Sequence, residues 1–283
     1  MPAPYRLLAC DIDGTLLDET SALRPETVRA VRRAAEAGLR VVLCSGRSYR
    51  QAKPFADALG LVEPLIVVGG AMVRHSVTAE IWEMRTFPSP GVAARLVRLI
   101  TAERLAVLAT VHGHPEGEYL VLRGEPADAF DEPRMRAHPG IFHFVGSAEE
   151  LDLTHALRVT VNATPGHFAA VRAAMETELA GQVRHHVIHA PDVKYPLMEI
   201  FPPAVHKWTA VESVAGRFGV SVAEIIAVGD DANDLEMVRG AGLGVAMGNA
   251  IPELRAAADR VIGRHSENGL ARFLDEVIAP LSP

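Results

Sequence analysis

Short apolar runs without polar alternation recur along this chain of 283 residues, and stretches with helical spacing of apolar residues separate them. The first three runs are residues 5–10, 39–44 and 65–68. A strand that is apolar on both faces needs cover on both sides, as in a parallel sheet with helices above and below. The sequence therefore predicts an α/β fold with a doubly wound, Rossmann-like parallel sheet.

The helical segments carry recognisable start and stop signals. Pro25 suits a first helical turn, Gly38 suits the position after a helix, and residues 48–59 form a second expected helix. The same alternation returns near the end of the chain, where we expect helices at 207–218, 234–239, 251–258 and 268–278 and strands at 225–228, 244–247 and 260–262.

The middle of the chain has a different character. In residues 158–162, polar Arg158, Thr160 and Asn162 alternate with apolar residues, which is typical of a strand with one apolar face. The polar face is expected to look either towards a substrate crevice or into solvent. We therefore predict a catalytic core made of residues 1–84 and 201–283, with an α/β cap domain, residues 85–200, inserted into it.

Composition narrows the class of protein. Hydrophobic residues make up 49% and charged residues 22%, as in a packed globular chain. The net charge of −7 disfavours a nucleic-acid partner, and no apolar stretch has the roughly 18 residues of a membrane span. Asp11 interrupts the N-terminal apolar run too early for a signal peptide. We expect a cytoplasmic protein that is a monomer or a homodimer.

Acidic side chains follow two of the expected strands. Asp11 and Asp13 come after the first strand, and Asp230 and Asp234 come after the strand 225–228. Parallel strands end at one edge of the sheet, so these groups should converge there, although Asp11 and Asp13 taken alone suit a solvated turn. Like charges 4 Å apart repel by about 4 kcal/mol even at an effective dielectric constant of 20, so such a cluster requires a cation.

The residue types in these segments favour Mg²⁺ and a phosphoryl group. Mg²⁺ prefers oxygen ligands and leaves room for water and substrate phosphate, whereas zinc prefers thiolate or imidazole, and neither lies in these segments. Lys207 and Arg47 would offset further negative charge. A carboxylate can act as a nucleophile towards phosphorus, and a second carboxylate can protonate the leaving oxygen and activate water.

Four segments, in order, resemble the motifs of the haloacid dehalogenase-like (HAD) phosphatase superfamily. They are residues 11–18, residues 45–47, Lys207 and residues 229–234. Residues 241–249, followed by 258–259 and 267–269, are similar to the Cof-type subgroup, whose members carry a C2 cap between the second and third motifs. The resemblance covers essentially the whole chain and implies a cap that selects the substrate.

The resemblance also implies roles for the charged residues. Asp11 would be the nucleophile and a Mg²⁺ ligand, and Asp13 would be the general acid and base and contribute its backbone carbonyl to the metal. Asp230 would complete the metal ligands. Lys207 would stabilise the charge on the nucleophile and the phosphate. Asp234 would support the metal-bound waters or Lys207.

Phosphate contacts are implied for the remaining motif residues: Thr15, Ser45, Gly46, Arg47 and Asn233. Three positions depart from the family pattern. Gly69 stands where an Asn is frequent, Asp231 where Asn or Gly is frequent, and Ser45 where Thr is common. None of these departures removes a catalytic group.

Other residues have alternative interpretations. We interpret Cys10 and Cys44 as buried apolar residues rather than a redox pair. The histidines at 112, 114, 185, 186 and 189 have metal-like spacing but are expected to be surface or packing residues rather than zinc ligands. The loop 112–117 is a second candidate for contacting the leaving group. Residues 240–244 match a dinucleotide-binding fingerprint only in part.

The expected function is a Mg²⁺-dependent phosphatase that hydrolyses a small phosphorylated metabolite, such as a sugar phosphate, through an aspartyl-phosphate. Alternatives within the enzymes are a sugar-phosphoglycerate phosphatase, a flavin-pathway phosphatase and a phosphomutase. The alternative outside the enzymes is a sugar-phosphate sensor, which would have no use for an acid and base at Asp13.

Overall fold

The computed structural model describes residues 5–115, 117–125, 130, 135–136, 140–188 and 194–278. The chain divides into two compact units, one up to Glu83 and from His206 onward, the other from Met84 to Val205. The second unit is thus an insertion in the first. Met84 and residues 201–205, which the sequence division gave to the core, fall in the second unit. At the second boundary, a strand that ends at Phe201 belongs to that unit's sheet.

In the described chain, eight strands form the sheet of the first unit, in the order β14-β13-β12-β1-β2-β3-β4-β5. The strands from β14 to β3 pair in parallel, and β4 pairs antiparallel to β3. Their bounds are β1 Leu7–Asp11, β2 Arg40–Cys44, β3 Pro64–Val67, β4 Met72–His75, β5 Ile81–Met84, β12 Ile225–Gly229, β13 Leu243–Ala246 and β14 Arg260–Val261. The predicted α/β class with a parallel-sheet core is confirmed.

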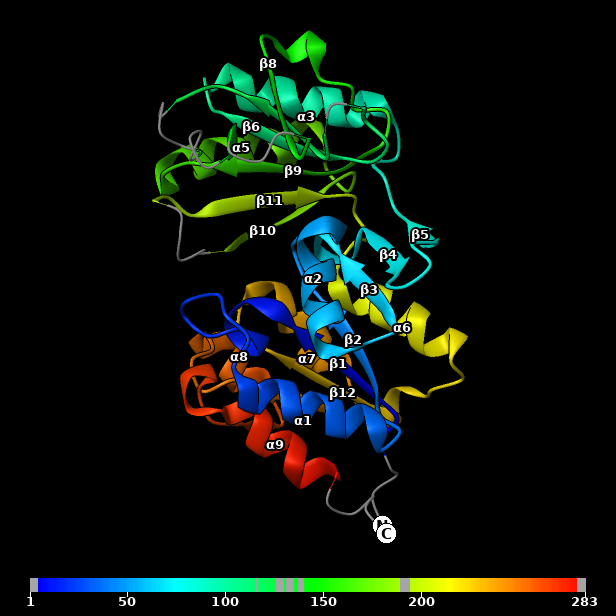
Figure 1. The fold of residues 1–283 in the computed structure, drawn as a ribbon. Coiled ribbons are helices and arrows are strands. Elements are labelled where there is room, and N and C mark those ends of the chain that lie inside the picture. Colours follow the sequence, from blue (N-terminus) through cyan, green and yellow to red (C-terminus); the bar gives the residue numbers. More distant parts are fainter. Residues whose placement is uncertain are drawn as a thin grey trace. The chain divides into compact units, whose positions relative to one another are not determined.

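Helices cover this sheet through their apolar sides. Helix α1 packs beside α9 and against β2, and α6 packs beside α7 (Figure 1). Leu7 and Ala9 of β1 form one apolar cluster with Val211 and Val214 of α6. The helices are α1 Pro25–Glu36, α2 Tyr49–Leu59, α6 Lys207–Arg217, α7 Leu235–Gly240, α8 Pro252–Ala257 and α9 Gly269–Ile278. Each predicted helix and strand of the core is present, with its ends shifted by at most two residues.

Local sequence explains where α1 and α2 begin and end. Pro25 occupies the first turn of α1, where its missing N–H is no loss. Ser48 precedes α2, and its backbone N–H donates to the Gln51 side chain at 3.1 Å in a capping box. Gly60, with φ +74°, ends α2 in the left-handed conformation. The loop 45–48 therefore lies between the end of β2 and the start of α2.

In the second unit, six strands of the described chain form a sheet in the order β10-β11-β9-β6-β7-β8, and only β7 and β8 pair in parallel. Helices α3 and α5 contribute apolar side chains to one face of this sheet, with Val159 and Val161 of β9. The elements are α3 Pro90–Ala102, β6 Val107–Val111, β7 Tyr119–Leu122, β8 Phe142–Val145, β9 Ala156–Asn162, α5 Pro165–Glu178, β10 Arg184–Ile188 and β11 Leu197–Phe201.

The polar face of β9 does not meet solvent. Arg158, Thr160 and Asn162 are only 5%, 2% and 0% exposed. The solvent-facing alternative is therefore wrong, because ion pairing with the neighbouring strand β11 compensates the charge that would otherwise keep Arg158 in water.

Ile225 of β12 tests how strongly the core depends on the cluster between the sheet and α6. Ile225 is fully buried, so Ile225→Ala should lower the free energy of unfolding by about 2–5 kcal/mol through lost transfer energy and a residual cavity. The measurement is urea unfolding followed by circular dichroism. Val222→Ala is the control, because Val222 is 46% exposed and its loss should cost under about 0.5 kcal/mol. Equal effects of the two substitutions would contradict this packing.

Candidate active site

Asp11 is the last residue of β1 and lies opposite Cys44 of β2. The strand thus runs one residue further than the predicted 5–10, because the pairing with β2 continues through Asp11. The residue is 4% exposed. The chain then turns sharply over Ile12–Leu16, and Asp13 lies within this turn.

Lys207 begins α6, and its ammonium group lies between two carboxylates. Its Nζ donates to Oδ1 of Asp11 and to Oδ1 of Asp234, both at 2.6 Å, and the residue is 1% exposed. A cation in the first turn of a helix is disfavoured by the helix dipole, so these carboxylates hold it there. Gly70 permits this placement, because a Cβ at Gly70 would lie 2.4 Å from the carbonyl oxygen of His206.

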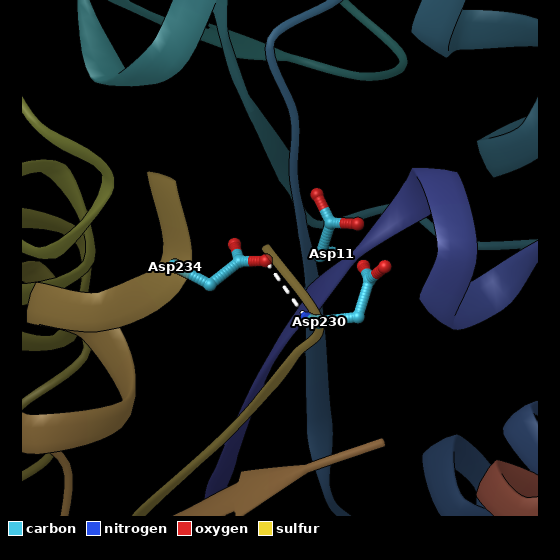
Figure 2. A group of neighbouring side chains, drawn as sticks. All are labelled: Asp11, Asp230 and Asp234. Atoms are coloured by element: carbon cyan, nitrogen blue, oxygen red, sulfur yellow. Dashed lines mark hydrogen bonds between the residues drawn. The ribbon is translucent and has the colours of Figure 1, made fainter. Parts of the chain in front are cut away.

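Asp230 and Asp234 follow β12 on one tight turn, and Figure 2 shows their carboxylates beside that of Asp11. Oδ2 of Asp234 accepts hydrogen bonds from the backbone N–H groups of Asp230 and Asp231, at 3.0 and 3.2 Å. Both Asp234 oxygens therefore have N–H donors. The Asp231 side chain accepts from the N–H of Ala232 at 2.7 Å, so this departure from the family pattern helps to cap the turn.

Asp230 is held by groups from two other segments. Thr15 Oγ1 donates to Asp230 Oδ1 at 3.1 Å, and Asn249 Nδ2 lies 3.4 Å from Asp230 Oδ2. Asn249 Nδ2 also donates to the carbonyl of Gly14 at 2.8 Å. A Cβ at Gly14, where φ is +78°, would lie 2.2 Å from Asp230 Oδ2, so only glycine permits this close approach.

Together these groups can hold a divalent cation. Oxygens of Asp11, Asp230 and Asp234 lie within 4.8 Å of one another, and no other group of three potential ligands of this kind occurs among the described residues. Three carboxylates and the Lys207 ammonium give a formal charge of −3 + 1 = −2. Oxygen ligands suit a hard cation, and Asp11 and Asp230 are the better ligands, because N–H donors occupy both oxygens of Asp234.

Burial shifts the pKa values in this cluster. It raises the pKa of Asp230 to about 8, with further upward contributions from Asp234 and Asp231. Burial also raises the pKa of Asp11 well above its usual range, although Lys207 acts in the opposite direction. For Lys207, burial acts to lower the pKa, but the Asp11 and Asp234 carboxylates outweigh it and leave the pKa above its usual value. Burial thus disfavours the ionised forms of both Asp11 and Asp230.

Asp13 lies apart from the carboxylate cluster. Its two oxygens accept from Nη2 and Nε of Arg47, at 2.5 and 2.8 Å, and its side chain is 48% exposed. Asp13 thus pairs with Arg47, whereas Asp11 pairs with Lys207. Arg47, which the resemblance assigns to phosphate, instead pairs with the expected acid and base.

The other predicted phosphate contacts lie around the same edge of the sheet. Buried Ser45 accepts from the backbone N–H of Arg47 at 3.1 Å, with Gly46 between them on the loop after β2. The N–H of Gly69 donates to the Ser45 carbonyl at 2.9 Å, so the backbone at this family departure still supports the loop. Asn233 is half-buried on the turn that carries Asp230 and Asp234.

Asn249 is the residue that sequence reasoning missed as part of the site. Besides its contacts to Gly14 and Asp230, its Oδ1 accepts from the backbone N–H of His265 at 3.1 Å. Its carboxamide therefore joins three segments of the core. The signal was available, because the resemblance includes residues 241–249, but no chemistry was assigned to them.

The weaker signals resolve without a second site. Cys10 and Cys44 are buried and not disulfide-bonded, and burial raises the pKa of each thiol, which confirms their interpretation as buried apolar residues. The described histidines join no three-ligand group. His189 and Glu116, from the histidine motif and the loop 112–117, lie outside the described residues.

The raised pKa of Asp230 predicts how stability depends on pH. Between about pH 4 and 8 the folded, metal-free protein holds a proton that the unfolded chain has released, so this group's stabilising contribution falls as pH rises. A divalent cation would bind the ionised carboxylate, so Mg²⁺, the expected metal, should raise Tm more at pH 8 than at pH 6. Differential scanning fluorimetry with and without Mg²⁺ measures this effect. Asp230→Asn is the control, and its Tm should lack the part of the pH dependence that Asp230 contributes. An equal Mg²⁺ effect on Tm at both pH values would contradict the assignment of Asp230 as the titrating metal ligand.

Removing the Asn249 carboxamide should loosen Asp230 without removing a carboxylate. Asn249→Ala is expected to weaken Mg²⁺ binding by about 10- to 100-fold, the usual effect of losing a group that orients a metal ligand. Isothermal titration calorimetry with Mg²⁺ measures this affinity. Glu253→Gln, on the exposed side of α8, should leave it unchanged. Unchanged affinity in Asn249→Ala would show that Asp230 is held by its other contacts.

Comparisons with known proteins identify the family of this chain. The family model of the haloacid dehalogenase-like hydrolases matches residues 8–274, so the chain belongs to this family of enzymes, as its motifs predicted. A 5-amino-6-(5-phospho-D-ribitylamino)uracil phosphatase of Bacillus subtilis (strain 168) is 29% identical over 96% of this chain and 97% of its own length. An HMP-PP phosphatase of Serratia proteamaculans (strain 568) is 30% identical over 95% of this chain and 94% of its own.

Solved structures show the same fold. A haloacid dehalogenase-like hydrolase from Bacteroides thetaiotaomicron superposes with a TM-score of 0.80 at 23% identity, over 96% of this chain and 99% of that one. A HAD subclass IIB sugar phosphatase gives 0.78 at 21% identity, over 96% and 98%. Among the described residues, no helix combines the length and the apolar character needed to cross a membrane.

Proposed function

We propose that this protein is a Mg²⁺-dependent phosphatase that hydrolyses small phosphomonoesters through an aspartyl-phosphate on Asp11. The observation that carries the proposal is the buried contact of Lys207 with Asp11 and Asp234. Lys207 occupies Oδ1 of Asp11 and leaves Oδ2 for attack on phosphorus. Names of the relatives support the reaction class, because both are called phosphatases.

In the first step, Asp11 Oδ2 forms a bond to phosphorus while the bond from phosphorus to the leaving oxygen breaks. Asp13 gives a proton to that oxygen, and for this its carboxyl must turn away from Arg47. In the second step, a water oxygen attacks phosphorus and Asp13 accepts the water's proton. The Asp11–phosphorus bond then breaks, which releases inorganic phosphate and restores the Asp11 carboxylate.

The remaining core residues hold the charge that builds up during transfer. Thr15, Ser45, Gly46 and Asn233 would bind phosphate oxygens, and Arg47, once released from Asp13, would add a positive charge. Asp11, Asp230 and the Asp13 carbonyl would hold Mg²⁺, which neutralises phosphate charge when bound. Lys207 keeps its proton because of its raised pKa, so it remains a cation throughout.

The second unit is proposed to act as the C2-type cap that selects the substrate. The relatives' names include a phosphate ester of a ribitylaminouracil, and one structural relative is named as a sugar phosphatase. A sugar phosphate or a flavin-pathway phosphate is therefore the proposed substrate class. A phosphomutase shares the nucleophile but transfers the phosphoryl group to a second hydroxyl, so it releases no free phosphate.

Substitutions at Asp11 and Asp13 test this mechanism. With p-nitrophenyl phosphate and Mg²⁺, Asp11→Asn should abolish phosphate release, because the carboxamide cannot form the aspartyl-phosphate. Asp13→Asn should lower kcat by about 10²- to 10⁴-fold, because the base that activates water in the second step is lost. The measurement is a malachite-green assay for free phosphate, with Tm as the control for folding.

Three outcomes would go against the proposal. Full activity in Asp11→Asn would remove the nucleophile assignment. Transfer to an added sugar phosphate without phosphate release would favour a mutase. Binding of a sugar phosphate with no turnover by the unmodified protein would favour a sensor.

A further inference from the structure

Strand β9 lies between β11 and β6 and carries a row of buried polar side chains on one face. Val159 and Val161 on the opposite face pack with the apolar side chains of α3 and α5. Arg158, Thr160 and Asn162 on the polar face are almost completely shielded from water. Buried polar groups in proteins are normally hydrogen-bonded. The hydrogen-bond partners of Arg158, Thr160 and Asn162 therefore indicate the function of this row.

The charged part of this face is satisfied by the protein itself. Arg158 forms an ion pair with Glu199 of β11, and its Nε lies 3.4 Å from Thr110 Oγ1. Glu199 Oε2 lies 2.9 Å from Nε2 of His186 on β10. Because Glu199 compensates the guanidinium, this end of the row offers no uncompensated positive charge to an anionic ligand.

The neutral part of the row lacks such partners. Thr160 Oγ1 and both polar atoms of Asn162, Oδ1 and Nδ2, are buried without a hydrogen-bond partner within the described part of the chain. Asn162 is 0% exposed, so neither atom is compensated by bulk water. Three unpaired polar atoms on adjacent positions of one strand face destabilise the ligand-free protein. Such an arrangement is expected where a ligand supplies the missing partners.

We infer that Thr160 and Asn162 bind the non-phosphate part of the substrate, and that this part presents a hydrogen-bond donor and acceptor side by side, as the lactam edge of a pyrimidine ring does. An asparagine carboxamide carries one acceptor and one NH₂ group in a single plane, which pairs with such an edge through two parallel hydrogen bonds. The Thr160 hydroxyl adds a third contact. The recognised group is neutral, because the guanidinium of Arg158 on this strand is already ion-paired with Glu199 of β11.

This inference narrows the substrate class and rests on the proposed phosphatase function. A polyol chain also forms hydrogen bonds, but each hydroxyl can rotate to donate or accept, so it does not require the fixed donor–acceptor pair of an amide. Because the atoms are shielded in this structure, a ligand reaches them only in a conformation that uncovers the polar face of β9.

Two nearly isosteric substitutions test the site. Asn162→Leu removes the donor and the acceptor, and Thr160→Val removes the hydroxyl. Hydrolysis of uridine 5′-monophosphate, ribose 5-phosphate and p-nitrophenyl phosphate is measured with Mg²⁺ for each protein. In Asn162→Leu, the ratio of kcat/KM for uridine 5′-monophosphate to that for p-nitrophenyl phosphate should fall about tenfold or more. The corresponding ratio for ribose 5-phosphate should stay within about twofold.

Controls separate recognition from structure and from chemistry. Thr177→Val, at an exposed position of α5, is the matched control for Thr160→Val and should change neither ratio. Tm of Asn162→Leu should equal or exceed that of the unmodified protein, because no protein hydrogen bond is lost. Binding of uridine, which carries no phosphate, is measured by calorimetry and should weaken in Asn162→Leu.

Each outcome decides the proposal. Equal falls for the uridine and ribose phosphates would overturn recognition of a lactam edge. A lower Tm with unchanged ratios would make Asn162 a structural residue. If the unmodified protein releases no phosphate from any of the three esters, the proposed phosphatase function fails. Uridine binding then tests the Asn162 site by itself. Weaker binding in Asn162→Leu supports the site, and unchanged binding overturns it.

Discussion

The ammonium group of Lys207, held 2.6 Å from both Asp11 and Asp234, is the interaction on which the site depends. It joins the end of β1, the start of α6 and the turn after β12, three segments far apart in the sequence. Charges buried this deeply are tolerated only when they are paired, and removing one partner of such a pair typically costs about 3–5 kcal/mol. Burial of these charges therefore requires that all three segments be in place.

This pairing leaves an excess of negative charge, and the carboxylates have different roles around it. Asp234 has N–H donors on both oxygens and acts as a fixed support for Lys207 and for the turn of Asp230. Asp230 contacts Thr15 and Asn249, yet burial still raises its pKa to about 8. The excess charge of −2 matches a divalent ion, and the Asp13–Arg47 pair nearby is already neutral.

Much of the fold was predictable because parallel strands are apolar on both faces and their helices carry clear end signals, such as Pro25 at the start of α1. The convergence of Asp11, Asp230 and Asp234 followed from a single rule about the ends of parallel strands. Contacts that depend on side-chain direction did not follow. The pairing of Asp13 with Arg47, the bridging role of Asn249 and the burial of the Arg158 face are set by a turn, a loop approach and a strand register that no local pattern specifies.

A crystal structure of the protein with Mg²⁺ and beryllium trifluoride, a stand-in for a phosphoryl group, tests the central claim most directly. We expect one metal ion bound by both Asp11 and Asp230, the beryllium on the Asp11 oxygen that Lys207 does not occupy, and Lys207 still in contact with Asp234. A metal ion bound elsewhere, or an Asp11 carboxylate that stays unmodified at saturating concentrations of both reagents, would contradict the account.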